Sequence, residues 1–226
     1  MLEGFLDLLL PSRCGGCGAF GALYCARCRQ RTHRLREPLC RRCGAEVEFV
    51  KSRCGCRDRL HALSRLRSAA RYEGPLEQAI RRFKYEGRRP LAKPLGALLL
   101  DRLAVDGPAG ELIAWVPLHP GRRRRRWFNQ SELLALEVQR GLDLELVPGR
   151  LERVRDTPAQ VGLDRRRRLT NVAGAFSWRG QDLAKRSVIL IDDVATTGAT
   201  LEACAVALRA AGAGAVTGLT VARVEL

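Results

Sequence analysis

The sequence has no apolar run long enough to cross a membrane. Its apolar stretches fall short of the ~20 residues that a membrane-spanning helix needs. The first ten residues are partly apolar, but Glu3 and Asp7 interrupt them and no basic segment precedes them, so we expect no signal peptide. These absences predict a soluble cytoplasmic protein.

Acidic residues are too few to balance the basic ones. The 226-residue chain has 24 Asp and Glu against 40 Lys and Arg, a formal net charge of +16, and nearly all of the positive charge is arginine. Such an excess favours a polyanionic partner, because each basic group near a phosphate releases counterions. The alternative is a solvated surface in an arginine-rich protein. The hydrophobic fraction of 46% fits a globular core, and the length allows one ordinary domain plus a small one.

The cysteines are concentrated near the start of the chain, and the ninth, Cys204, is expected in the core. The other eight form four close pairs: Cys14 with Cys17, Cys25 with Cys28, Cys40 with Cys43, and Cys54 with Cys56. In a reducing compartment this spacing predicts two tetrahedral, structural Zn²⁺ sites; disulfides or a redox motif are the weaker alternatives. Pairing of neighbours along the chain and an interleaved arrangement both stay open. We predict a double zinc ribbon over residues 1–60 and a main domain over 61–226.

The strongest functional signal in the main domain is a strand followed by a loop of small residues. Residues 188–191 predict a buried strand, which ends in Asp192 and Asp193. The loop has little side-chain bulk, so its backbone amides at the start of the next helix can close around a phosphate. It consists of Ala195, Thr196, Thr197, Gly198, Ala199 and Thr200. The two carboxylates would face ribose hydroxyls or Mg²⁺. An ordinary strand-to-helix turn is the alternative interpretation.

A second predicted strand, residues 112–116, ends in a basic loop. His119 follows the strand, and the loop then contains Arg122, Arg123, Arg124, Arg125, Arg126 and Trp127. A second arginine run consists of Arg165, Arg166, Arg167 and Arg168. The two runs predict the sides of one groove for single-stranded DNA, in which Trp127 and Phe128 offer stacking faces. Taken alone, each run is also typical of solvated charge, and Asn129 with Glu132 is also typical of a helix cap.

These motifs resemble a known family. Asp-Asp-Val-Ala-Thr-Thr-Gly-Ala-Thr, residues 192–200, is similar to the signature of type I phosphoribosyltransferases, which bind 5-phosphoribosyl 1-diphosphate (PRPP). Val-Pro-Leu-His at 116–119, Phe-Asn-Gln at 128–130 and the cysteine pairs resemble the ComF branch of that fold, whose members serve DNA uptake in natural transformation. That branch has glycine where this chain has Trp127. The resemblance implies an α/β fold, a mostly parallel sheet flanked by helices.

The resemblance also implies a ligand set. PRPP with Mg²⁺ would bind at Asp192, Asp193 and the loop 195–200, with His119 and Arg126 at its diphosphate end. Position 2 is not cysteine, so the N-terminal nucleophile of glutamine-dependent amidophosphoribosyltransferases is absent. Thr196 stands where purine phosphoribosyltransferases carry a carboxylate that acts as general base, which argues against purine salvage. Three functions stay open: a ComF-like protein that binds single-stranded DNA, PRPP and proteins of the uptake machinery; an active phosphoribosyltransferase with an unknown acceptor; and a non-catalytic PRPP-sensing regulator.

Overall fold

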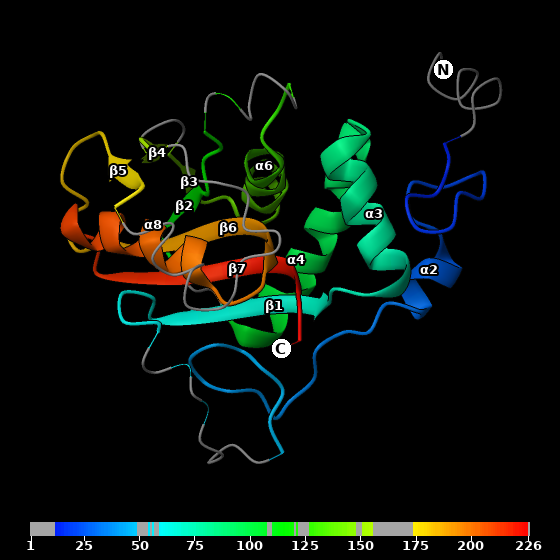
Figure 1. The fold of residues 1–226 in the computed structure, drawn as a ribbon, viewed down its shortest axis with the longest axis horizontal. Helices are drawn as coiled ribbons and strands as arrows, with labels where there is room; N and C mark the ends of the chain where they lie inside the picture. Colours follow the sequence, from blue (N-terminus) through cyan, green and yellow to red (C-terminus); the bar gives the residue numbers. More distant parts are fainter. Residues whose placement is uncertain are drawn as a thin grey trace.

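A five-stranded parallel sheet organises the chain (Figure 1). The computed structural model describes residues 12–48, 54, 56, 59–107, 110–119, 121, 127–147, 151–155 and 174–225. The strand order is β1 (Arg65–Arg71), β7 (Ala215–Arg223), β6 (Ser187–Ala195), β2 (Leu112–Trp115) and β3 (Glu145–Leu146). A separate antiparallel pair joins β4 (Leu151–Arg153) to β5 (Phe176–Trp178). The predicted α/β fold with a parallel sheet is confirmed.

Alternating side chains of β6 divide the core into two layers. Ile189 and Ile191 face the layer that contains α3 (Gly74–Tyr85), α4 (Ala92–Asp106) and α6 (Gln130–Leu142). Val188 and Leu190 face the opposite layer, which contains α8 (Ala199–Ala210) and the β4–β5 pair. A central parallel strand must be apolar on both faces, which explains the continuous apolar run in the sequence. Two short helices complete the described elements, α2 (Ala26–Gln30) and η1 (Arg89–Leu91), the latter leading into α4.

Local signals set the ends of the helices. Pro75 lies in the first turn of α3, where the missing N–H costs nothing. Asn129 caps α6 by accepting a hydrogen bond from the backbone N–H of Ser131 at 3.0 Å, so the capping interpretation of Asn129 is confirmed. The α8 helix follows Gly198, whose φ of 83° is a left-handed conformation that favours glycine. None of the described helices is both long and apolar enough to span a bilayer.

Strand β6 is longer than the sequence predicts. Pairing with β7 continues to Ala195, which lies opposite Arg223, so Asp192 and Asp193 belong to the strand and do not follow it. Successive residues of a strand point to opposite faces, and the two carboxylates therefore have different neighbours.

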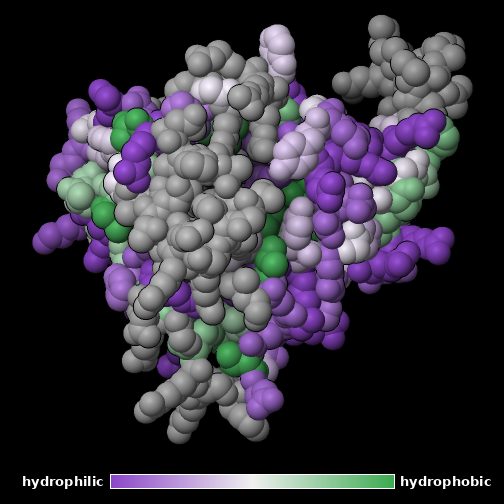
Figure 2. Space-filling model, viewed as in Figure 1, coloured by the Kyte–Doolittle hydropathy of each residue, from purple (hydrophilic) through white to green (hydrophobic). Residues whose placement is uncertain are grey.

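The cysteine-rich segment packs on both layers of the core. Cys14, Cys28 and Tyr24 belong to the apolar cluster of α3 and α4, whereas Cys43 and Cys56 belong to the cluster of α8. Each end of the segment thus completes a different face of the same sheet. On the face shown in Figure 2, hydrophilic side chains predominate over α3, beside the part of the segment that packs there.

Candidate functional site

The eight clustered cysteines form two groups of four. Neighbouring pairs combine: Cys14, Cys17, Cys25 and Cys28 form the first knuckle, and Cys40, Cys43, Cys54 and Cys56 form the second. Their sulfurs lie 3.6 Å (Cys14 to Cys28), 3.7 Å (Cys17 to Cys25), 3.7 Å (Cys40 to Cys56) and 3.4 Å (Cys43 to Cys54) apart. A tetrahedron with Zn–S bonds of about 2.3 Å places sulfurs about 3.8 Å apart. The residues therefore fit Zn²⁺, and the interleaved pairing is wrong.

Hydrogen bonds from backbone N–H groups favour the thiolate form of one cysteine in each knuckle. Burial raises the pKa of the Cys14 thiol, but hydrogen bonds from backbone N–H groups, including that of Cys25, outweigh burial and lower the pKa to about 6. The same balance lowers the pKa of Cys40 to about 7. A thiolate is the form that binds zinc. Zinc in such closed four-thiolate sites stabilises the fold and performs no chemistry.

The carboxyl end of β6 carries an ion pair. Lys84, in the last turn of α3, places its Nζ 2.7 Å from Asp193 Oδ1, and both side chains are largely buried. Asp192 points elsewhere: its Oδ1 accepts hydrogen bonds from Ser131 Oγ at 2.8 Å and from the backbone N–H of Asp193 at 2.9 Å. The capped start of α6 and the end of α3 thus meet the strand at one place.

Burial and neighbouring charges shift the pKa values of Asp192 and Lys84. Burial, and then the charge of Asp193, raise the pKa of Asp192 to about 7. Burial acts to lower the pKa of Lys84, but Asp193 and Asp192 together raise it above its ordinary value. The site therefore favours a cation beside Asp193, and Lys84 supplies that cation in the free protein. Carboxylate oxygens are also among the ligands that Mg²⁺ prefers.

The loop of small residues lies where β6 turns into α8. Thr197 is buried, and its Oγ1 accepts a hydrogen bond from the backbone N–H of Ala199 at 3.3 Å. Gly198 has the left-handed φ noted above, and the helix then begins at Ala199. Backbone N–H groups at a helix start attract anions. The loop and the Asp192–Asp193 pair are therefore neighbours at one edge of the sheet.

The second predicted loop is described only in part. β2 pairs with β6, Trp115 opposite Ile191, so His119 lies beyond the same edge of the sheet. The Nδ1 of His119 accepts a hydrogen bond from the backbone N–H of Gly121 at 3.3 Å. Trp127 is 84% exposed, as a stacking face requires, but Phe128 is buried against Phe83, so its expected role as a stacking face is wrong. The arginine runs 122–126 and 165–168 lie outside the described residues.

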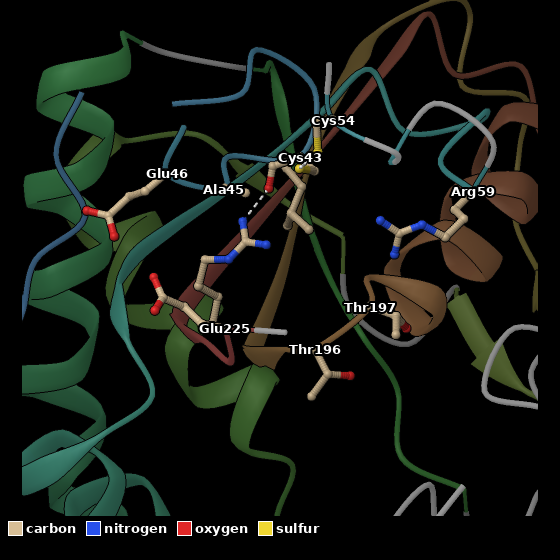
Figure 3. A pocket seen from close by; sticks show the side chains of 10 residues that line it. Cys43, Ala45, Glu46, Cys54, Arg59, Thr196, Thr197 and Glu225 are labelled. Atoms are coloured by element: carbon tan, nitrogen blue, oxygen red, sulfur yellow. Dashed lines mark hydrogen bonds between the residues drawn. The ribbon is translucent and has the colours of Figure 1, made fainter. Parts of the chain in front are cut away.

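A pocket of about 300 Å³ adjoins the loop on the side of the second knuckle. Cys43 and Cys54 form one wall, and Thr196 and Thr197 lie on the opposite side (Figure 3). The guanidinium group of Arg59 points into the space between them (Figure 3). Arg223, at the end of β7, also lines the pocket, and its Nη1 donates a hydrogen bond to the backbone carbonyl of Cys43 at 2.7 Å.

Several of these residues escape prediction from the sequence. Lys84 belongs to a basic cluster after a helix, which the sequence alone indicates to be either solvated charge or a basic rim near a phosphate site. Nothing in the sequence ties it to Asp193. Ser131 looks like an ordinary residue in the first turn of a helix. Arg59 and Arg223 lie in segments without a distinctive motif, and they meet only because the second knuckle packs beside the end of β7.

Comparison with known proteins identifies relatives over most of the chain. Residues 5–60 match the double zinc ribbon domain family. Competence protein F of Haemophilus influenzae is 32% identical over 198 residues, which cover 83% of this chain and 85% of that protein. DNA utilization protein YhgH of Escherichia coli K12 is 32% identical over 219 residues, 92% of this chain and 96% of the relative. The crystal structure of TT1426 from Thermus thermophilus has 21% identity and a TM-score of 0.35, covering 57% of this chain and 72% of that one.

Proposed function

The chain belongs to the family of Competence protein F and DNA utilization protein YhgH, and we propose that it acts on DNA during its uptake or use. In this proposal it binds single-stranded DNA through its arginine-rich loops and binds PRPP at the carboxyl end of β6. The knuckles hold structural zinc and provide a surface for partners of the uptake machinery. The family match over 92% of the chain carries the DNA role, because it includes both the knuckles and the sheet.

Two features support DNA as the ligand. The formal charge of +16 attracts a polyanion at long range. Trp127 directly follows the five arginines and is 84% exposed, while Arg89 fixes its backbone by donating a hydrogen bond to its carbonyl oxygen at 3.2 Å. An exposed indole beside basic residues suits a base of a single strand, since stacking is worth about 1–3 kcal/mol per base.

The geometry at the end of β6 supports a phosphorylated sugar as the second ligand. Asp192 and Asp193 can accept hydrogen bonds from ribose hydroxyls, and the loop 196–200 offers backbone amides to the 5-phosphate. Mg²⁺, when bound with PRPP, would neutralise the diphosphate. Lys84 lies at the same point and can pair with that diphosphate once it leaves Asp193. The residues that we assign to the diphosphate end are His119 and Arg126.

A phosphorus NMR titration tests the PRPP site. Wild type should broaden or shift the resonances of Mg²⁺–PRPP, and Asp193→Asn should weaken this effect at least tenfold. Pyrophosphate release with an added nucleophile would identify an enzyme, whereas binding of PRPP without turnover or DNA affinity would identify a sensor. Unchanged resonances with wild type would rule out the PRPP site.

Fluorescence anisotropy with a labelled single-stranded oligonucleotide tests the DNA role. Affinity should fall steeply as salt rises, and replacement of Arg122, Arg123, Arg124, Arg125 and Arg126 by Gln should reduce both the affinity and the salt slope. Replacement of the exposed Arg140 by Gln is the control, because this side chain pairs with Glu137 near the far end of α6. Equal affinities of the multiple variant and the wild type would contradict the proposed groove.

A further inference from the structure

The geometry of the pocket beside the second knuckle points to a binding site for a phosphate group, with Arg59 and Arg223 as its ligands. Neither the resemblance nor the arginine runs include these two residues. The inference extends the proposed function and rests on it, because the ligands of that function would supply the phosphate. That origin is either the small sugar phosphate held by the loop or the backbone of a DNA strand.

The shape of the pocket suits a small anion. Its volume of about 300 Å³ is at the lower end for small-molecule sites. Thr196 and Thr197 line the pocket on the side of the loop, and the guanidinium of Arg59 points into it (Figure 3). Guanidinium and hydroxyl groups are the usual donors to phosphate, because a guanidinium can donate two parallel hydrogen bonds to it.

The carboxylates in the wall of the pocket bind a cation that lies outside it. Glu46 and Glu225 line the pocket, but both pair with Arg71, which does not line it. A four-thiolate zinc site carries a net negative charge, yet cationic side chains surround the second knuckle. Arg67 donates a hydrogen bond to the carbonyl of Cys40 at 3.3 Å, and Arg223 donates one to that of Cys43. Arg59 and Arg223 are therefore the cationic side chains of the described pocket lining that can donate to an anion.

The walls of the pocket are fixed relative to one another. Glu202, in the first turn of α8, accepts hydrogen bonds from the backbone N–H groups of His61 and Ala62 at 2.7 Å and of Leu63 at 3.1 Å. Leu60 packs against Gly198, where an added Cβ would lie 3.2 Å from its side chain. The segment that carries Arg59 is thus attached to the start of α8. The backbone on the knuckle side of the pocket is consequently tied to the loop side.

Proton–nitrogen NMR of the arginine Nε–H groups tests the site with inorganic phosphate as the probe. Saturable shifts of Arg59 and Arg223 are expected, with little shift of the exposed control Arg140. Arg59→Gln should weaken phosphate binding at least fivefold at unchanged zinc content. Arg223→Lys keeps the charge beside Cys43 and should weaken binding by less than Arg223→Gln. Equal, unsaturable shifts of all three arginines would overturn the inference.

Competition identifies the source of the phosphate and separates this inference from the proposed function. Displacement of inorganic phosphate by PRPP assigns the pocket to the sugar phosphate, and displacement by a single-stranded oligonucleotide assigns it to DNA. If PRPP shifts residues 196–200 while neither inorganic phosphate, PRPP nor the oligonucleotide shifts either arginine, the PRPP site stands and the pocket proposal fails. If inorganic phosphate shifts the arginines while PRPP binds nowhere, the pocket stands and the PRPP site fails.

Discussion

Trp127 adopts a backbone conformation that residues other than glycine rarely take. Its φ is 63°, a left-handed value that favours glycine. The ComF branch, which this sequence resembles, has glycine at this position. Trp127→Gly should therefore raise the free energy of unfolding by about 1 kcal/mol, because glycine adopts this conformation without strain. The same change removes the exposed indole and should weaken binding of single-stranded DNA severalfold. Urea unfolding and anisotropy check the two effects. A loss of stability would show that the indole packs more tightly than its exposure indicates.

Asp192 should make stability depend on pH. Its pKa is raised from 3.8 to about 7 in the folded chain, so the unfolded chain loses this proton first as pH rises. Stability contributed by the protonated carboxyl is complete below pH 4 and disappears as pH rises to about 7. Asp192→Asn does not titrate, and its stability relative to wild type should increase by roughly 2 kcal/mol between pH 5 and pH 8. Thermal unfolding at both pH values measures this change.

Lys84 should be important for stability as well as for binding. Lys84→Met leaves Asp193 beside Asp192 without its cation and should cost about 3 kcal/mol, the usual loss when one partner of a buried pair is removed. Adding Asp193→Asn should restore part of that stability, since the uncompensated charge is then gone. Lys93→Met, an exposed change in α4, serves as the control in urea unfolding. A double variant less stable than Lys84→Met would argue against the ion pair.

At the scale of secondary structure elements, Glu202 connects α8 to the segment that leads into β1. Glu202→Gln replaces one accepting oxygen by an NH₂ group that faces backbone donors, and it should cost about 2 kcal/mol. Amides of residues 61–63 should exchange hydrogen faster, while those of β6 change little at matched stability. The exposed Glu86→Gln is the control. Unaltered exchange at residues 61–63 would contradict this role.

The sequence predicts most elements because their signals are local. The apolar strands, the proline at the start of α3 and the cap at Asn129 all act within a few residues. The sequence predicts too short a β6, because its last four residues are strand only through pairing with β7, more than twenty residues further along. The pattern of residues 188–195 alone contains no sign of that pairing.

Contacts between distant segments account for what the sequence does not predict at the site. Lys84 meets Asp193 because α3 packs against the sheet near the carboxyl end of β6. No local pattern in the sequence predicts this packing. The grouping of the cysteines likewise depends on how the second knuckle folds back, although the number of zinc sites follows from their count. The roles of the loop 195–200, His119 and the arginines stay predictions, as does the domain boundary at residue 60.

At the scale of the whole molecule, zinc should stabilise both faces of the sheet. Cys14→Ser and Cys40→Ser should each reduce the zinc content from about two ions to about one, and each should lower the thermal midpoint of the entire chain. The reason is that Cys14 and Cys28 pack in one apolar layer and Cys43 and Cys56 in the other. Metal analysis and near-ultraviolet circular dichroism check this. Cys204→Ala, a buried change outside the knuckles, should retain both ions. A sheet that melts at an unchanged temperature after both ions leave would contradict the prediction.

The hydrogen bond from Arg223 to the carbonyl of Cys43 joins parts of the chain that are made at very different times. Residues 40–46 leave the ribosome long before β7, which is the last of the described strands. The second knuckle can take up zinc early, but the surface on which it docks is complete only after β7 and Glu225 have been added. Its final position is therefore reached late in synthesis. A nascent chain that stops before β7 would carry a folded knuckle that can contact β1 but lacks the rest of its docking surface.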